Sequence, residues 1–251
     1  MPIRAVVKII KKYYEELYLF VRRVRHLPGL DKRSLGFDWE AINYNRISVL
    51  FLIMTAFRNP RYLEIGCSSN ATFNSIPFGD KVGVDPFRGG NLRLFSDEFF
   101  AQNFKKFDVI FIDGDHTYEQ VRRDVINALR SLERGGWIVL HDMLPRDAIE
   151  SHVPLLENGP WTGDVWKVGF ELARIQSIPF KIFKIDFGVG VLRCPSKEIE
   201  WDQNNYLNLS SKTFSYYHDN LSILPIVSFE EGAQWIRDTL ASKNIEESRS
   251  F

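Results

Sequence analysis

Between residues 61 and 142, short apolar runs alternate with stretches of helical periodicity. The clearest runs end in an acidic residue or just before a polar turn. Strands that are buried on both faces of a parallel sheet have this pattern, and the helices between them form right-handed crossovers. The predicted strands are YLEI (62–65), KVGVD (81–85), FDVIFID (107–113) and GGWIVLHD (135–142), and a weaker run lies at NLRLF (91–95).

Two helices and a hairpin complete the predicted core. Four apolar residues between Val121 and Leu132, spaced by three or four positions, predict a helix from Tyr118 to Glu133, which Gly135-Gly136 ends. A shorter helix is predicted from Asp164, as its N-cap, to Ala173. The runs FKIFKID (180–186) and VGVLRC (189–194) predict an antiparallel hairpin. We therefore expect an α/β fold with helices on both faces of a mostly parallel sheet.

Outside this core, the two ends of the chain have other patterns. Proline and glycine residues between 28 and 36 indicate a linker, and a helix is predicted from Asp38, as its N-cap, to Phe57. A further helix is predicted from Phe229 to Leu240. We predict three parts, namely an N-terminal helical extension (1–58), a core (59–194) and a C-terminal extension (195–251).

The first 26 residues predict a basic amphipathic helix. Apolar residues recur from Ile3 to Val24 at alternating steps of four and three positions, so they share one side of a helix. Seven Lys and Arg residues against two Glu residues give this segment a formal charge of +5. Such a helix packs on the domain, mediates a homo-oligomer, or makes a peripheral contact with an anionic membrane. The sequence leaves these alternatives open.

Composition narrows the class of protein. The chain has 251 residues and 45% hydrophobic content, enough for one substantial core. Its 32 basic and 32 acidic residues balance, and no basic stripe accompanies the core, which argues against a nucleic-acid partner. The two cysteines, Cys67 and Cys194, are too few for a disulfide framework.

These features predict where the protein works. The longest apolar stretch, from Ile47 to Phe57, is about half the ~20 residues that a transmembrane helix needs. The N-terminus lacks the pattern of a signal peptide. We therefore expect a cytoplasmic protein, which the N-terminal helix could also hold at the inner face of the membrane.

Polar residues gather where the predicted strands end. In an open α/β sheet, ligands bind outside the carboxyl ends of the strands, so these residues are the candidates for a site. They are Glu64, Gly66, Cys67, Ser68 and Asn70 after the first strand, Asp85 after the second, Asp97 after NLRLF, Asp113 and His116 after FDVIFID, and His141 and Asp142 after GGWIVLHD.

The first turn, EIGCSSN, indicates the kind of ligand. It lacks the second and third glycines of the G-x-G-x-x-G fingerprint, which disfavours NAD. Glu64, two residues before Gly66, instead suits a ligand with a cationic end. Asp85 is placed at the next strand end, where a carboxylate can accept from both ribose hydroxyls. S-adenosylmethionine has both an ammonium group and a ribose.

The segments FDVIFIDGDHTYEQVRRDV and GGWIVLHDM resemble the class I S-adenosylmethionine-dependent methyltransferases, in the small-molecule branch that includes catechol-type enzymes and enzymes of glycan and natural-product biosynthesis. The resemblance covers roughly residues 60 to 194. It implies a Rossmann-like seven-stranded sheet whose last strand is antiparallel, with the cofactor over the first two strands. It also implies that Asp97 binds the adenine amino group and that Asp113 lies near the methionine moiety.

The sequence departs from the family in its first turn, where Ser68 and Asn70 replace two glycines. Asparagine tolerates positive φ better than most residues, so the turn can form, while the serine side chain can crowd the cofactor. The departures bear on cofactor affinity.

Methyl transfer is an in-line displacement, so the enzyme must align the acceptor and remove its proton. His116 and His141 are the candidate bases, with Asp113 and Asp142 beside them. In catechol-type relatives, acids after the fourth and fifth strands hold magnesium. The matching residues here are Asp113, His141 and Asp142, and because histidine is a poor magnesium ligand, Mn²⁺, another transition metal or no metal fits better than Mg²⁺.

The leading hypothesis from the sequence is O-methylation of a hydroxyl of a sugar or another small metabolite in a glycan or natural-product pathway. Trp161, in the loop between Met143 and Gly163, could stack on such an acceptor. The alternatives are N-methylation of an amino sugar and a non-catalytic cofactor-binding module of a glycan-assembly system.

Overall fold

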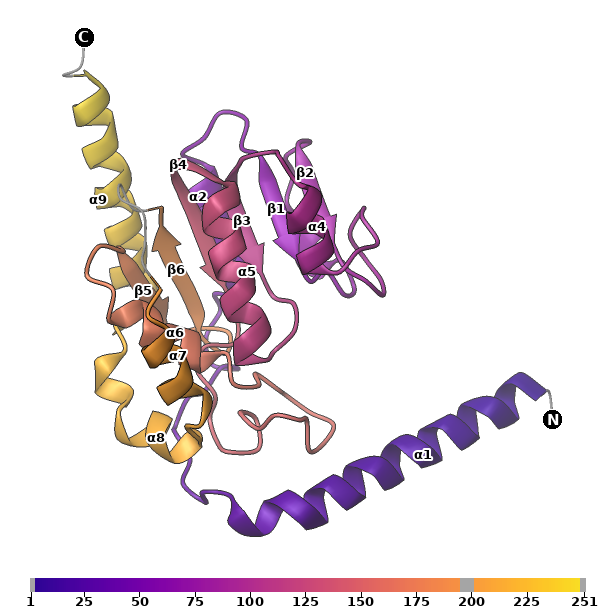
Figure 1. The fold of residues 1–251 in the computed structure, drawn as a ribbon. Coiled ribbons are helices and arrows are strands. Elements are labelled where there is room, and N and C mark those ends of the chain that lie inside the picture. Colours follow the sequence, from indigo (N-terminus) through magenta and orange to yellow (C-terminus); the bar gives the residue numbers. More distant parts are fainter. Residues whose placement is uncertain (1–2, 195–200, 249–251) are drawn as a thin grey trace.

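The predicted apolar runs form one seven-stranded sheet in the computed structural model, which describes residues 3–194 and 201–248. The strands lie in the order β2-β1-β3-β4-β6-β5-β7 (Figure 1). Their bounds are Tyr62–Ile65 (β1), Lys81–Val84 (β2), Phe107–Ile112 (β3), Leu132–Leu140 (β4), Phe180–Phe183 (β5), Val189–Arg193 (β6) and Ile226–Val227 (β7).

Strand directions confirm the predicted mostly parallel sheet. β2, β1, β3 and β4 pair in parallel, β5 pairs in parallel with β7, and β6 runs antiparallel to both of its neighbours, β4 and β5. The predicted hairpin of 180–186 and 189–194 is the antiparallel pair of β5 and β6.

The weak strand predicted at 91–95 does not form. Leu92 forms only an isolated bridge with Val84, because the side chain of Asn91 occupies the edge of β2. Its Oδ1 accepts from Gly83 N at 2.8 Å, and its Nδ2 donates to Lys81 O at 3.1 Å. The seventh strand is instead β7, from the C-terminal segment.

Helices cover both faces of the sheet because residues of each strand alternate between two cores. Ile110 and Ile112 of β3 pack in the core under α4 to α8, whereas Val109 and Phe111 pack in the core under α2, α3 and α9. The α-helices are Ile3–His26 (α1), Arg46–Met54 (α2), Ala71–Ser75 (α3), Ser96–Gln102 (α4), Tyr118–Ser131 (α5), Trp166–Ala173 (α6), Gln203–Ser210 (α7), Phe214–Asp219 (α8) and Phe229–Ser248 (α9).

The predicted bounds of α2, α5 and α6 were wrong for local reasons, and α9 continues beyond its predicted end at Leu240 to Ser248. α2 begins at Arg46 because the Asn45 side chain accepts from Ile47 N, whereas Asp38 caps only a turn through Ala41 N. α6 begins at Trp166, since the carboxylate of Asp164 accepts from Tyr118 N and Lys167 Nζ. α5 ends at Ser131, and Gly135-Gly136 lie inside β4.

The segments predicted as extensions share the packing of the core, except for α1. α2 and α9 lie against the same sheet face, where Leu50 and Ile236 are fully buried. α1 projects away from the body (Figure 1) and exposes its apolar side chains, such as Tyr14 at 70% and Val24 at 61%. Every helix in the described residues is too short or too polar to span a bilayer.

Candidate active site

Residues beyond the carboxyl ends of β1 to β4 line one cavity of about 1050 Å³. The structure therefore brings together side chains that the sequence scatters over almost 80 positions. Asn70 is the single predicted site residue that does not line this cavity. Those that do are Glu64, Gly66, Cys67, Ser68, Asp85, Asp97, Asp113, His116, His141 and Asp142.

The first turn keeps its shape despite the two missing glycines. Gly66, Ser68 and Asn70 have positive φ values of 84°, 45° and 67°, so the serine and asparagine adopt the conformation that favours glycine. The Asn70 side chain turns to the neighbouring loop, where its Oδ1 accepts from Gly90 N at 2.6 Å. This bond compensates for the strain, and it explains why Asn70 lies outside the cavity.

Asp85 is held by backbone amides. Its Oδ2 accepts from Cys67 N at 3.0 Å and Ser68 N at 2.9 Å, and its Oδ1 accepts from Phe87 N and Arg88 N at 2.8 Å each. Burial alone would raise the pKa of Asp85, but these four bonds lower it. The carboxylate thus clamps the first turn to the loop after β2, and its ribose contact stays a prediction.

Glu64 lies in β1 and lines the cavity, where it is buried at 1% exposure. The Tyr62 hydroxyl donates to its Oε2 at 2.6 Å. Burial raises the pKa of Glu64 to about 7, and this bond only partly offsets the effect. A cationic group that entered the cavity would favour the charged form, as the sequence hypothesis requires.

Asp97 and a second acid lie at another part of the lining. Asp97 is in the first turn of α4, where its Oδ2 lies 3.4 Å from Arg123 Nε, and its adenine contact stays a prediction. Asp124 is fully buried, and its Oδ2 has no hydrogen-bond partner among the described residues. Burial raises the pKa of Asp124 to about 6. Asp124 is therefore a further polar candidate that sequence reasoning missed.

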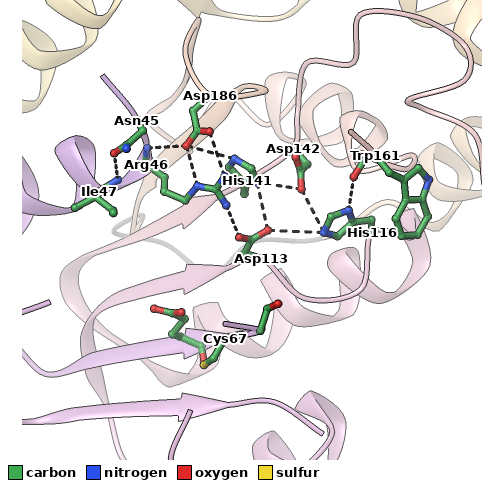
Figure 2. A network of polar contacts seen from close by, with 12 residues as sticks. Asn45, Arg46, Ile47, Cys67, Asp113, His116, His141, Asp142, Trp161 and Asp186 are labelled. Atoms are coloured by element: carbon green, nitrogen blue, oxygen red, sulfur yellow. Dashed lines mark hydrogen bonds and ion pairs between the residues drawn. The ribbon is translucent and has the colours of Figure 1, made fainter. Parts of the chain in front are cut away.

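Six charged or titratable side chains meet in the rest of the lining (Figure 2). They come from the N-terminus of α2, the ends of β3 and β4, and the turn between β5 and β6. Two of them were not predicted as site residues. We call this group the acid-histidine cluster, and it consists of Arg46, Asp113, His116, His141, Asp142 and Asp186.

Arg46 joins two carboxylates of the cluster. Its Nη1 donates to Asp113 Oδ2 at 2.6 Å, and its Nε donates to Asp186 Oδ2 at 2.8 Å. Burial alone would raise the pKa of Asp113, but His141 and Arg46 hold it below its ordinary value. Burial alone would also raise the pKa of Asp186, but His141 and Arg46 lower it below its ordinary value. Both carboxylates are therefore charged at neutral pH.

His141 is buried among three carboxylates, at 5% exposure. Its Nδ1 lies 3.0 Å from Asp142 Oδ2 and 3.3 Å from Asp113 Oδ1, and its Nε2 lies 3.6 Å from Asp186 Oδ2. None of these contacts has the geometry of a hydrogen bond. Burial alone would lower the pKa of His141, but Asp142 and Asp113 raise it well above its ordinary value. In this state His141 is a weak proton acceptor.

His116 has a defined tautomer. Its Nδ1 lies 2.7 Å from Trp161 O, and because a carbonyl oxygen only accepts, Nδ1 carries the hydrogen. Nε2 faces the acids, at 3.3 Å from Asp142 Oδ2 and 3.8 Å from Asp113 Oδ1. The ring also stacks on Trp161, with 5.0 Å between centroids. Nε2 is therefore the nitrogen that the ring presents to the acids of the cluster.

The residues predicted to hold a divalent ion fit such a group. Asp113, His141 and Asp142 each offer one ligand atom, and these atoms lie within 4.8 Å of one another. The unpartnered nitrogens of His141 point to the same conclusion, because a buried imidazole without a partner is costly. Such an ion remains a proposal.

The missed residues had weak signals in the sequence. Asn45 and Ser48 form a capping box, and recognising it would have placed Arg46 at a helix start instead of inside a helix. Asp186 lies in the hairpin turn, where it, Phe187 and Gly188 all have positive φ. Nothing in the periodicity marks Asp124, which sits beside buried Val125 on α5.

Glu64 makes stability depend on pH. Its pKa of about 7 exceeds the ordinary 4.5, so between these values the folded protein keeps a proton that the unfolded chain releases. The stabilisation is complete below pH 4.5 and is lost as the pH rises through 7. We expect the free energy of unfolding of the parent to fall by roughly 3 kcal/mol relative to Glu64→Gln between pH 4 and 8.

Urea unfolding at each pH measures this difference. Glu230→Gln is the matched control, because Glu230 is exposed on α9. The difference in unfolding free energy between the parent and Glu230→Gln should not show the fall expected for Glu64. If the unfolding free energies of the parent and Glu64→Gln changed equally with pH, the pKa of Glu64 would not be raised by burial, and the prediction would be wrong.

Comparisons with known proteins agree with this geometry. Residues 81–143 match a family model described as a methyltransferase domain, and this segment contains Asp85, Asp113, His116, His141 and Asp142. No curated protein matches the chain.

Several solved structures resemble the chain at low identity. A Corynebacterium glutamicum protein is 12% identical with a TM-score of 0.45, over 78% of this chain and 100% of that one. An O-methyltransferase of Bacillus cereus in complex with S-adenosylhomocysteine is 15% identical with a TM-score of 0.39, over 69% and 88%. An O-methyltransferase of Streptomyces achromogenes involved in tomaymycin synthesis is 16% identical with a TM-score of 0.38, over 57% and 77%.

The match to the methyltransferase model covers β2, β3 and β4 but not β1, and in the described sheet β6 is the antiparallel strand. Residues 81–143 of this chain are therefore similar to a methyltransferase domain.

Proposed function

We propose that this enzyme transfers a methyl group from S-adenosylmethionine to a hydroxyl of a sugar or another small metabolite, in a glycan or natural-product pathway of the cytoplasm. One observation carries the proposal. A single cavity is lined both by the acids predicted for the cofactor and by a cluster able to take up a proton. Donor and acceptor could therefore meet inside it.

The cofactor side rests on Glu64 and Asp85. Glu64 is a buried carboxylate whose neutralisation by an ammonium group would offset the cost of its burial. Asp85 accepts four backbone bonds, so ribose hydroxyls would have to share or replace some of them. Asp97 and the unpartnered oxygen of Asp124 are the candidate acceptors for the adenine amino group.

The acceptor side rests on the acid-histidine cluster. When bound, S-adenosylmethionine supplies a methyl group that an in-line nucleophile can displace. The chain must then orient a hydroxyl and take its proton, and His116 with Asp113 and Asp142 forms the basic group within the lining. Trp161 lines the cavity beside His116 and offers an aromatic surface for a sugar ring. A divalent ion held by Asp113, His141 and Asp142 would acidify the hydroxyl.

Binding and turnover test the proposal in turn. In calorimetric titration at pH 8, S-adenosylmethionine should saturate one site, and Glu64→Gln should weaken binding at least tenfold, or about 1.4 kcal/mol. Glu230→Gln should bind as the parent does. His116→Ala should keep cofactor affinity but slow methyl transfer about 100-fold, the lower range of general acid-base effects.

The acceptor class is read from methyl-labelled S-adenosylmethionine incubated with nucleotide sugars and their amino analogues. Label on a hydroxyl oxygen supports the proposal, whereas label on nitrogen assigns the enzyme as an N-methyltransferase. Saturable cofactor binding without transfer to any acceptor would favour the non-catalytic module instead.

A further inference from the structure

We propose that His116 is a fourth ligand in a divalent-metal site with Asp113, His141 and Asp142, and that this site selects a transition-metal ion over Mg²⁺. The inference concerns metal binding and holds whether or not the proposed methyl acceptor is correct. It adds a fourth ligand to the three-residue set expected from the sequence and agrees with that set in preferring a transition-metal ion.

Four donor atoms form a closed ring (Figure 2). The two histidine nitrogens, His116 Nε2 and His141 Nδ1, alternate with the two carboxylate oxygens, Asp113 Oδ1 and Asp142 Oδ2. The successive separations around the ring are 3.8, 3.3, 3.0 and 3.3 Å. Each nitrogen thus lies between the same two oxygens.

These separations match the spacing of metal ligands. An ion held at about 2.1 Å by each donor separates neighbouring donors by about 3.0 Å in octahedral geometry and about 3.4 Å in tetrahedral geometry. The four successive separations bracket both values. The donors that all lie within 4.8 Å of one another are those of Asp113, His141 and Asp142, so His116 must approach further to complete the site. Hydrogen bonding does not account for it, because the contacts of His141 lack hydrogen-bond geometry.

The tautomer of His116 adds an electrostatic reason. Since Nδ1 donates to Trp161 O, the lone pair of the neutral ring at Nε2 faces Asp142 Oδ2. A lone pair and a carboxylate repel each other unless a proton or a cation lies between them. Nδ1 of His141 faces both carboxylates as well. One ion in the ring would satisfy all four donors.

The charge of the cluster also fits a divalent ion. Three carboxylates, those of Asp113, Asp142 and Asp186, face one guanidinium, that of Arg46, which leaves two negative charges when both histidines are neutral. Arg46 binds Asp113 through Oδ2 and leaves Oδ1 to the ring. Arg46 and Asp186 would then support the ligands from behind.

The donor set determines which ion is preferred. Mg²⁺ takes oxygen ligands in a strict octahedron, whereas imidazole nitrogen suits Zn²⁺, Fe²⁺, Ni²⁺ and related ions. Two imidazoles of four protein ligands therefore disfavour Mg²⁺. When the ion is bound, Nε2 of His116 is one of its ligands, so His116 acts as the base of the proposed function only in the protein without the ion.

Metal binding to the full chain tests the inference without any turnover. The protein is stripped with a chelator and titrated with Co²⁺, whose visible absorption reports its ligands, and metal content is measured after gel filtration. We expect one Co²⁺ per chain, retained in a 100-fold excess of Mg²⁺. His116→Ala should weaken binding at least tenfold, while His218→Ala, at a histidine outside the cavity, should bind as the parent does.

Circular dichroism of each variant confirms that it is folded, and His116→Gln provides a second, more conservative replacement. Equal Co²⁺ affinity in the parent and both His116 variants would overturn the four-ligand site. Displacement of Co²⁺ by equimolar Mg²⁺ would overturn the selectivity.

A separate observation concerns α1, and from it we infer that α1 lies on an anionic membrane surface with its apolar side in the lipid. Two contacts that tie its end to the body come from arginines of the polar side, and a third is the ring of His26 against that of His152, with 4.8 Å between centroids. Arg22 Nη1 donates to Leu155 O at 3.1 Å, and Arg23 Nη2 lies 3.1 Å from Glu157 Oε2. The apolar side is left exposed, at 39–73% for Val6, Val7, Ile10, Tyr13, Tyr14, Leu17, Phe20, Val21 and Val24.

Charge and the width of this face favour lipid over a second copy of the chain. The helical segment carries +5, so two copies that paired through α1 would bring like charges together, whereas anionic lipid attracts them. The apolar face includes Val6, Tyr13 and Phe20 beside the heptad positions, which makes it wider than a coiled-coil seam. Aromatic residues on such a face are typical of interfacial helices.

Figure 1 shows α1 on the side of the sheet where β1 and β3 end, which is the side of the cavity residues.

Vesicle sedimentation tests this placement with the full chain. It should bind vesicles of phosphatidylcholine with 30% phosphatidylglycerol and not vesicles of pure phosphatidylcholine. Leu17→Glu, in the apolar face, should reduce binding at least tenfold. Phe104→Glu makes the same change in charge at a 95% exposed residue on the body and should bind as the parent does.

Two results would overturn the membrane role. One is sedimentation that Leu17→Glu does not change. The other is absence of vesicle binding together with a dimer that Leu17→Glu dissociates, which would assign the face to a second copy.

Discussion

The parallel register of β1, β3 and β4 is the constraint on which the site depends. Ile65 pairs with Ile112 across β1 and β3, and the ladder continues one step further, since Asp113 N donates to Ile65 O at 2.8 Å and His141 N donates to Ile112 O at 3.1 Å. The residue after each strand therefore reaches the same edge of the sheet. Gly66 must lack a side chain there, because a Cβ would lie 2.1 Å from the carbonyl oxygen of Asp113.

The buried acids at this edge differ in their pKa, which is raised for Glu64 and lowered for Asp113 and Asp186. Glu64 accepts a hydrogen bond from the neutral Tyr62 hydroxyl and not from a cationic side chain of the described residues. Burial therefore raises its pKa, and a proton neutralises the carboxylate. Asp113 and Asp186 keep their charge because Arg46 binds both. An unpaired buried carboxylate is expensive, and ligands that bring positive charge relieve the cost. We therefore propose that a cationic cofactor binds at Glu64 and that a cation binds within the acid-histidine cluster.

Local pattern predicted the strands and the residues that end them, because buried parallel strands are continuously apolar and their polar ends are short-range signals. The pattern could not show what each side chain contacts. The sequence did not show that Asp85 accepts from four backbone amides, and its predicted ribose contact stays a prediction. Arg46 and Asp186 enter the site from a helix start and a hairpin turn more than 100 residues apart. Only tertiary packing brings them beside Asp113.

The seventh strand shows the same limit. The run at 91–95 has the composition of a strand, yet the amide of Asn91 occupies the edge that it would have joined. The C-terminal segment, in which no strand was predicted, supplies β7 at the opposite edge. Sheet edges are therefore decided by competition between segments and not by propensity alone.

The central claim is that the cavity between the first turn and the acid-histidine cluster holds S-adenosylmethionine, with its ammonium group at Glu64. A crystal structure of the full chain with S-adenosylhomocysteine, the demethylated product, tests it most directly. We predict the ammonium group within hydrogen-bond distance of the Glu64 carboxylate and the sulfur turned toward Asp113 and His116. A ligand bound elsewhere, or one with its ammonium group away from Glu64, would contradict the claim.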